Sequence, residues 1–122
     1  MNIPADLKYS KTHEWVKDLG GGLFETGISD FAQKELGDIV YINLPQTGDE
    51  LTEGKSFADI ESVKAVSDIL SHITGKVKEI NEALVSAPDS INKAPYENWL
   101  IRAEGTVSAA LLSAGEYEKI AK

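Results

Sequence analysis

One lysine of the sequence stands where acyl-transfer chemistry would need it. Lys64 lies between two strand-like segments, Phe57–Ser62 and Ala65–Ile69, which places it at the tip of a tight hairpin. A lysine amine is protonated at neutral pH and is therefore a poor nucleophile. A group joined to it must come from an activated acyl donor, through an enzyme that engages an exposed turn. The spacing alone leaves two interpretations open, a functional lysine at the tip and a lysine that simply guards a turn or a sheet edge.

Gly54-Lys55-Ser56 has the residue types that end a phosphate-binding loop, but it lacks the context of one. Such a loop has four residues between its glycines and opens a helix, whereas five residues separate Gly48 from Gly54 and the following segment is strand-like. Asp49, Glu50 and Glu53 would repel a phosphate, and they also lack the spacing of a calcium loop. We therefore expect a charged, solubilising turn here.

The two histidines could in principle serve a hydrolase together with a serine and an acid. No Gly-x-Ser-x-Gly elbow is present. We expect His13 to begin a strand and His72 to lie in a solvated turn. A small hydrolase that uses either histidine is the weaker alternative, and turnover that survives Lys64→Ala would favour it.

Composition excludes several classes of function. The 122 residues suffice for one domain, and the absence of cysteine excludes disulfides, thiolate metal sites and a cysteine nucleophile. We expect no metal site. Twelve basic and twenty acidic residues give a net charge of −8, which repels phosphate backbones and anionic lipid, so we expect neither nucleic acid nor a membrane as partner. Without a long apolar run or a signal peptide, the chain is expected to be cytoplasmic, or a mature form whose targeting peptide is absent.

Most segments have the character of short strands separated by turn residues, which predicts a small sandwich or barrel. In one of them Val40, Ile42 and Leu44 are expected on one face and Tyr41 and Asn43 on the other. Gly20-Gly21-Gly22 predicts a hairpin turn. The expected strands are Glu14–Lys17, Leu23–Ile28, Ile39–Leu44, Ser56–Ser62, Ala65–Ile69, Gly75–Ile80 and Trp99–Ala103.

Two segments have helix boundary signals instead. Ser29–Leu36 begins with Ser29 or Asp30 as N-cap, has Gln33 in capping-box position and ends before Gly37. A C-terminal helical segment is expected over about 108–122, with a Ser-x-x-Glu box formed by Ser113 and Glu116. Between the last two strands, Pro88, Asp89, Asn92 and Pro95 predict an irregular connection.

Several segments together carry a resemblance to a known family. The order Gly-Asp-x-φ-x-x-Gly-x-x-φ-x-x-Ile-Glu-x-x-Lys, with φ apolar and Lys64 last, is similar to lipoyl and biotinyl carrier domains. Ile60–Ala65 with Ser67-Asp68 downstream resembles the lipoylation segment of the glycine cleavage H-protein family, whereas biotinyl domains usually have methionines on both sides of the lysine. Agreement extends over nearly the whole chain, through Tyr9–Val16, Gly27–Gln33, Leu36–Tyr41, Asn81–Leu84, Pro95-Tyr96 and Trp99-Leu100.

The resemblance implies a fold and a class of function. The fold would be mainly β, a flattened lipoyl/biotinyl-type β-barrel or sandwich with short added helices and a C-terminal helix. Residues 1–122 would form a single lipoyl-carrier domain, with the lipoyl hairpin at about 56–70. The protein would be a carrier subunit and not an enzyme, and we expect a monomer.

The resemblance also implies a cofactor, partners and site residues. Lipoate would be joined by an amide to Lys64, within a segment that includes Glu61, Ser62, Val63 and Ala65. The lipoyl arm would take up the aminomethyl group left when glycine decarboxylase releases CO₂, pass it to aminomethyltransferase and be reoxidised by dihydrolipoyl dehydrogenase. Lipoate-attaching enzymes would modify the lysine. Thr12, Glu14 and Asp68 match positions that line the cleft for the loaded arm.

The sequence departs from the family pattern at two places and leaves alternatives open. Ser71-His72 stands where the family usually has Ser-Pro, and Tyr96–Trp99 lacks a usual glycine before the last strand. Neither departure touches the lysine segment. A lipoyl-relay paralogue in the same family, and a lipoyl domain of a 2-oxoacid dehydrogenase, are the alternatives. The added N- and C-terminal segments argue against the second.

Overall fold

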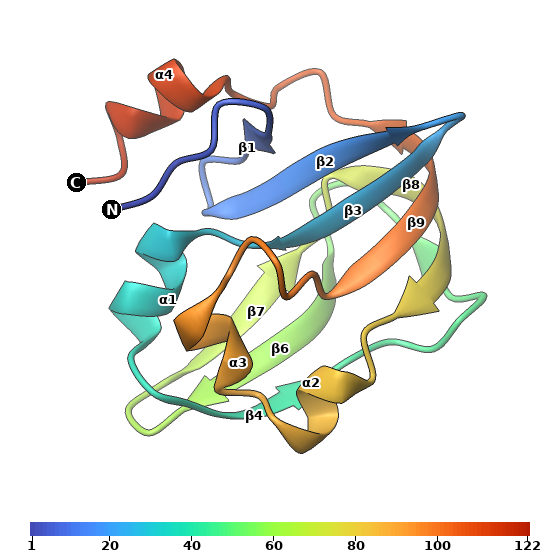
Figure 1. Cartoon of the computed structure of the whole chain (residues 1–122). Helices are drawn as coiled ribbons and strands as arrows, with labels where there is room; N and C mark the ends of the chain where they lie inside the picture. Colours follow the sequence, from blue (N-terminus) through green and yellow to red (C-terminus); the bar gives the residue numbers. More distant parts are fainter.

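The structure is a computed structural model that describes residues 1–122, and it is mainly β. A six-stranded antiparallel sheet has the order β1-β2-β3-β9-β8-β5, and a three-stranded antiparallel sheet has the order β4-β6-β7 (Figure 1). The two sheets do not close into a barrel, so the expected barrel or sandwich takes the open form. The strands are β1 (Lys8–Tyr9), β2 (Glu14–Gly20), β3 (Leu23–Ile28), β4 (Ile39–Asn43), β5 (Glu50–Leu51), β6 (Ser56–Ser62), β7 (Val66–Leu70), β8 (Ile73–Ile80) and β9 (Ile101–Val107).

The long pairing of β8 with β9 extends beyond the segments expected from the sequence. The two strands pair from Ile73 opposite Val107 to Ile80 opposite Ile101. In the middle Gly75 faces Gly105, and a Cβ on Gly75 would overlap the carbonyl oxygen of Glu104. Such close approach of two backbones requires glycine. The second half of β9 is polar and shows no apolar alternation, so its sequence does not predict a strand. It is a strand because it pairs with β8.

The alternation expected in β4 is wrong at one residue. Ile42 is buried as expected, but Val40 is exposed and Ile39 is buried in its place. The register between β4 and β6 shifts between Ile39 and Tyr41, which is the signature of a β-bulge. The extra residue changes which side chains face the core. Figure 1 shows β4 next to β6 at the lower edge of the molecule.

The helix boundary signals predicted α1 well. Helix α1 (Asp30–Leu36) has Ser29 as N-cap, whose Oγ accepts a hydrogen bond from the Ala32 amide at 3.2 Å. It ends at Gly37 with a φ of 77°, a conformation that favours glycine. The expected capping box is wrong, because Gln33 donates to the Asp30 side chain instead of to the backbone.

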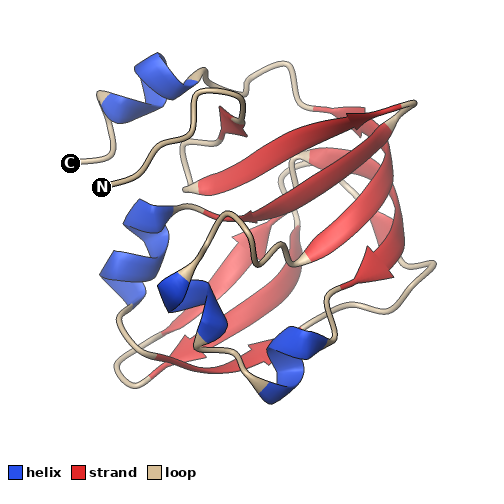
Figure 2. Cartoon of the chain, viewed as in Figure 1, coloured by secondary structure: helices blue, strands red, loops and turns tan.

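The remaining helices are short. Helix α4 (Ala114–Glu118) has the predicted capping box of Ser113 and Glu116, but it occupies only part of the 108–122 segment. The connection after β8 is not irregular throughout, since it contains α2 (Ala83–Ser86) and α3 (Ser90–Lys93). In Figure 2 the helices gather along one side of the strands. None of the helices has the length and apolar character needed to cross a bilayer.

The buried apolar side chains form two clusters. The larger one lies between the two sheets and contains residues of both, such as Ile60 and Ile101. The smaller one joins the N-terminal segment, the start of β2 and α4, and its members are Leu7, Tyr9, Trp15, Tyr117 and Ala121. Inside it the rings of Tyr9 and Tyr117 stack at 4.6 Å. This smaller cluster fixes the segment that leads into β2.

Candidate functional site

Strands β6 and β7 form the hairpin that presents Lys64, as the sequence predicts. The Ser62 amide donates to the Ala65 carbonyl at 2.8 Å, and Glu61 pairs with Val66 in the ladder. The buried Ser62 Oγ accepts hydrogen bonds from the amides of Lys64 at 3.3 Å and Ala65 at 3.1 Å. One serine therefore satisfies the backbone of the turn and holds the tip in a single conformation.

The Lys64 side chain is exposed and chemically free. It takes part in none of the five ion pairs of the structure. Its Cε lies 3.6 Å from the place where a Cβ on Gly37 would be, so the stem lies beside the end of α1. The Val63 amide donates to the Asp38 carbonyl at 3.1 Å and ties the tip to the same connection. The backbone that carries the amine is therefore a fixed turn, and the amine itself is exposed.

A cavity of about 270 Å³ begins directly beside this tip. One wall is helix α1, another is β7, and the segment before β2 closes the end. Seven of its twelve lining residues are apolar, and its carboxylates are Glu14 and Glu35. We call it the arm cleft, and its lining residues are Thr12, His13, Glu14, Ile28, Phe31, Ala32, Glu35, Leu36, Ala65, Val66, Ser67 and Ile69.

Glu14 is a buried carboxylate that is held by several donors. It is 2% exposed, and its Oε1 accepts hydrogen bonds from Ser10 Oγ at 2.7 Å and from the Thr12 hydroxyl. His72 Nε2 lies 2.8 Å from the same oxygen. A buried charge is tolerated only when it is paired or hydrogen-bonded, and this network meets that condition. The result is an anionic group in an otherwise largely apolar cleft.

His13 shapes the wall next to Glu14. It is the only residue other than glycine with a positive φ, 74°, and its carbonyl accepts from the Ser29 amide at 3.0 Å. Its ring packs on Phe31 with the centroids 4.4 Å apart. Burial lowers the pKa of His13, although Glu14 opposes this. A neutral imidazole in the cleft leaves the carboxylate available to a cation.

Tyr117 connects the C-terminal helix to this wall. Its hydroxyl lies 2.8 Å from His13 Nδ1 and 2.6 Å from Ser29 Oγ, and the side chain is fully buried. Burial raises the pKa of Tyr117, which keeps the hydroxyl neutral. Through this contact helix α4 holds the His13 side chain, whose backbone has the positive φ.

Replacing Tyr117 with phenylalanine is expected to destabilise the fold by about 1–2 kcal/mol, because two buried polar groups lose a partner. Urea unfolding measures this change. Tyr41→Phe is the matched control, since Tyr41 is half exposed and its hydroxyl makes no hydrogen bond. Equal stability of the two variants would contradict the role given to Tyr117.

The structure brings most of the predicted site residues together. Thr12 and Glu14 line the arm cleft, and Ala65 connects it to the tip that carries Lys64. Asp68 is an exposed residue of β7 that pairs with Asp59 and does not line the cleft. The other predicted tip residues, Glu61, Ser62 and Val63, lie in the hairpin as expected.

The expectation for His72 is wrong. Its side chain is only 13% exposed and bonds to Glu14 instead of lying in a solvated turn. The two residues are 58 positions apart, and no local pattern links them. Only the packing of β2 against the turn after β7 makes the contact. Sequence reasoning had no signal from which to find it.

The hydrolase alternative finds no support in this geometry. Thr12 Oγ1 and Glu14 Oε1 lie 3.5 Å and 2.8 Å from the same His72 nitrogen, Nε2. A catalytic triad needs the nucleophile on one ring nitrogen and the acid on the other. His13 Nδ1 is occupied by Tyr117. Neither histidine therefore has a serine hydroxyl on one ring nitrogen and a carboxylate on the other.

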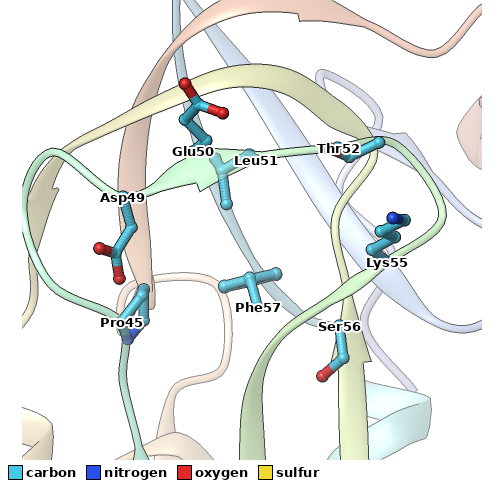
Figure 3. A pocket seen from close by; sticks show the side chains of 8 residues that line it. All are labelled: Pro45, Asp49, Glu50, Leu51, Thr52, Lys55, Ser56 and Phe57. Carbon is cyan, nitrogen blue, oxygen red and sulfur yellow. The ribbon is translucent and has the colours of Figure 1, made fainter.

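The largest cavity, about 410 Å³, lies elsewhere and has no such chemistry. Figure 3 shows the carboxylates of Asp49 and Glu50 pointing away from Lys55. Ser56 begins strand β6 and not a helix, so Gly54-Lys55-Ser56 is no phosphate loop, as expected. At about 3.3 Å per residue along β6, this cavity lies roughly 20 Å from the hairpin tip. No group of three or more His, Cys, Asp or Glu residues is arranged to hold a metal ion.

Comparison with known proteins agrees with this geometry. A family model described as "Glycine cleavage H-protein" matches residues 7–122. The glycine cleavage system H protein of Idiomarina loihiensis is 50% identical over 121 residues, covering 96% of this chain and 94% of that protein. Those of Lachnoclostridium phytofermentans and Carboxydothermus hydrogenoformans are each 48% identical, covering 100% and 97% of this chain and 97% and 93% of those proteins. A crystal structure of the Mycobacterium marinum protein of that name superposes with a TM-score of 0.90 at 36% identity, covering 96% of this chain and 97% of the other.

Proposed function

Because the chain belongs to the glycine cleavage H-protein family, we propose that it carries lipoate on Lys64. Membership makes it a non-catalytic carrier subunit of the glycine cleavage system. The observation that supports the attachment site is the Lys64 amine, exposed and unpaired at the tip of a hairpin whose turn is held by Ser62.

The residues around the tip fit a lipoyl group. A lipoyl arm is a flexible apolar chain that ends in a dithiolane, and the arm cleft offers mostly apolar walls beginning at Ala65 and Val66. Gly37 leaves room beside the Lys64 stem. When bound, the lipoyl group supplies a disulfide that accepts an aminomethyl unit and later returns to the oxidised state. The chain itself supplies attachment, shelter and a counter-charge.

Glu14 is the residue that we assign to the counter-charge. An aminomethyl unit bound through sulfur carries a protonatable amine, and a buried carboxylate holds such a cation by a charge-assisted hydrogen bond. The apolar walls of the cleft keep water from the same place. Thr12 holds Glu14 and lines the cleft. Asp68 lies outside the cleft lining, so the proposal for the cation rests on Thr12 and Glu14.

The proposed partners follow from the reaction cycle of the family. Glycine decarboxylase would load the arm, aminomethyltransferase would unload it, dihydrolipoyl dehydrogenase would reoxidise it, and a lipoate-attaching enzyme would modify Lys64. Each of them needs access to the same tip. The exposed Val63 and Val66 on either side of Lys64, with the exposed Glu61 nearby, offer a common surface for recognition.

Intact mass of the protein purified from its native host tests the attachment. We expect a lipoyl increment that peptide mapping assigns to Lys64. A biotinyl increment would replace the cofactor in the proposal, and a lysine that remains bare under glycine-dependent growth would refute the carrier role of this residue.

Glu14→Ala is expected to shorten the time for which the aminomethyl unit stays on the protein by about tenfold, because a charge-assisted hydrogen bond is lost. Release of the unit in the absence of aminomethyltransferase measures this lifetime. Glu35→Ala is the matched control, since Glu35 lines the same cleft but is exposed and makes no hydrogen bond. An unchanged lifetime in the Glu14 variant would contradict the assignment.

A further inference from the structure

The two oxygens of the Glu14 carboxylate are held very differently. Oε1 accepts from Ser10 Oγ at 2.7 Å, from the Thr12 hydroxyl and from His72 Nε2 at 2.8 Å. Oε2 has only the Leu70 amide, at 3.4 Å. A carboxylate has about four acceptor sites over its two oxygens, so three donors exceed the ordinary share of one oxygen. Oε2 is the oxygen with acceptor capacity to spare.

We propose that His72 is a positioning residue, which holds Oε1 of Glu14 so that Oε2 remains available to a cationic amine in the arm cleft. The inference rests on the proposed function, because it takes Glu14 as the counter-charge of the cleft. Ser10 and Thr12 lie in the same chain segment as Glu14, only four and two residues before it. His72 is the one side-chain donor that comes from a distant segment and can fix the carboxylate against the rest of the fold.

The backbone around His72 is rigid enough for this task. The His72 carbonyl accepts from the Ser108 amide at 2.8 Å. The neighbouring residue Ser71 makes two further backbone hydrogen bonds. Its amide donates to the Lys55 carbonyl and its carbonyl accepts from the Gly54 amide, each at 2.8 Å. The imidazole thus projects from a segment tied on both sides, between β7 and β8. The position of the His72 backbone is therefore set by the sheets and not by Glu14.

His72 approaches Glu14 from outside the arm cleft. It lines a separate cavity of about 250 Å³ together with Lys11 and Glu53, whereas the arm cleft does not include it. Thr12 lines both cavities, so the segment before β2 forms the partition between them. A donor on the far side of this partition can orient the carboxylate without occupying the space of the arm. That placement suits a positioning residue and not a residue that contacts the cargo.

The chemistry of the contact restricts the state of the ring. An ionised carboxylate only accepts hydrogen bonds, so Nε2 has to carry a proton. Both the imidazolium and the neutral Nε2–H tautomer meet this condition. The His72 amide itself donates to no acceptor, so replacement by proline, the usual residue of the family here, removes no backbone hydrogen bond.

The experiment compares three variants that differ in whether position 72 can donate. His72→Gln keeps an amide donor, whereas His72→Leu and His72→Pro have none. We expect the loss of the donor to shorten the lifetime of the bound aminomethyl unit about fivefold and the glutamine variant to stay within about twofold of the wild type. In a Glu14→Ala background the same changes are expected to have no further effect.

A second readout uses the protein without lipoate. Nitrogen-15 NMR of labelled histidine is expected to show Nε2 of His72 protonated in the wild type and a mixture of tautomers in Glu14→Ala. Thermal unfolding of each variant separates loss of fold from loss of positioning. Leucine and proline both lack a side-chain donor at position 72, so these two variants are expected to give the same lifetime.

The outcomes are distinguishable from failure of the proposed function. If Glu14→Ala leaves the lifetime unchanged, the counter-charge assignment fails and this inference fails with it. If Glu14→Ala shortens the lifetime but His72→Leu and His72→Pro do not, only the positioning role is wrong. Equal losses in the leucine and glutamine variants would likewise overturn it, because donation would then not be what matters.

Discussion

Replacing Lys64 with arginine is expected to abolish glycine cleavage supported by this protein and to remove the lipoyl mass increment completely. Arginine preserves the positive charge and the long stem beside Gly37, but its guanidinium has no free amine for acylation. Lys64 is exposed and makes no ion pair, so the fold should be unaffected, with a change in stability within about 0.5 kcal/mol. Mass spectrometry and thermal unfolding of one preparation test both statements.

Lys55→Arg is the matched control for this loss. Lys55 is also an exposed lysine beside β6, but it lies at the opposite end of the strand from the tip. We expect the control to be lipoylated and active at the level of the wild type. Turnover that persists in Lys64→Arg or Lys64→Ala would show that the activity does not depend on this amine, and would refute the attachment proposal.

Trp15→Ala is expected to be the most destabilising single truncation, at about 3–5 kcal/mol. Trp15 has no exposed surface, and its ring packs so closely on Gly27 that a Cβ there would lie 2.9 Å from three ring atoms. Its indole nitrogen donates to the Pro95 carbonyl at 3.2 Å. The cavity left behind opens the smaller core cluster, which anchors the segment before β2. Thermal unfolding should show a lower Tm by roughly 10–20 °C.

Trp99→Ala removes the same type of side chain at a position where less of it is buried. Trp99 is partly exposed, and its ring lies 4.1 Å from the Arg102 guanidinium carbon. We expect a loss of about 1–2 kcal/mol, mainly from the cation–π contact and the partial burial. Because Trp99 packs against the edge of the same smaller cluster, comparable losses in the two tryptophan variants would mean that the full burial of Trp15 adds no stability beyond the partial burial of Trp99.

Because Trp15 follows Glu14 directly, its truncation also tests how the cleft is supported. Tyr117 packs in the same cluster and holds His13 from the other side. Both supports come from outside the hairpin that carries Lys64. A variant that folds but has a loosened smaller cluster should retain lipoylation, which needs the tip, and lose retention of the aminomethyl unit, which needs the cleft.

Several features of the fold were predictable because neighbouring residues decide them. The Ser29 cap and the Gly37 stop of α1, and the Ser113 and Glu116 box of α4, act within one turn of helix. Other features depend on a partner strand. The two-residue strands β1 and β5 and the polar half of β9 are too short or too polar to show alternation, and they become strands only by pairing.

The sequence by itself determined that Lys64 lies at the tip of a hairpin, because strand pattern, turn length and the Ser62 hydroxyl all act within a few residues of it. It also determined the family, since the matching segments run along nearly the whole chain. Only the tertiary structure decided what stands beside the lysine. Glu14 meets His72 across 58 positions, because a contact of this kind is set by how the sheets pack and not by any local spacing. Which neighbours of Lys64 in β7 line the cleft also depends on where α1 and the segment before β2 are packed, and Ser67 and Ile69 line it whereas Asp68 does not.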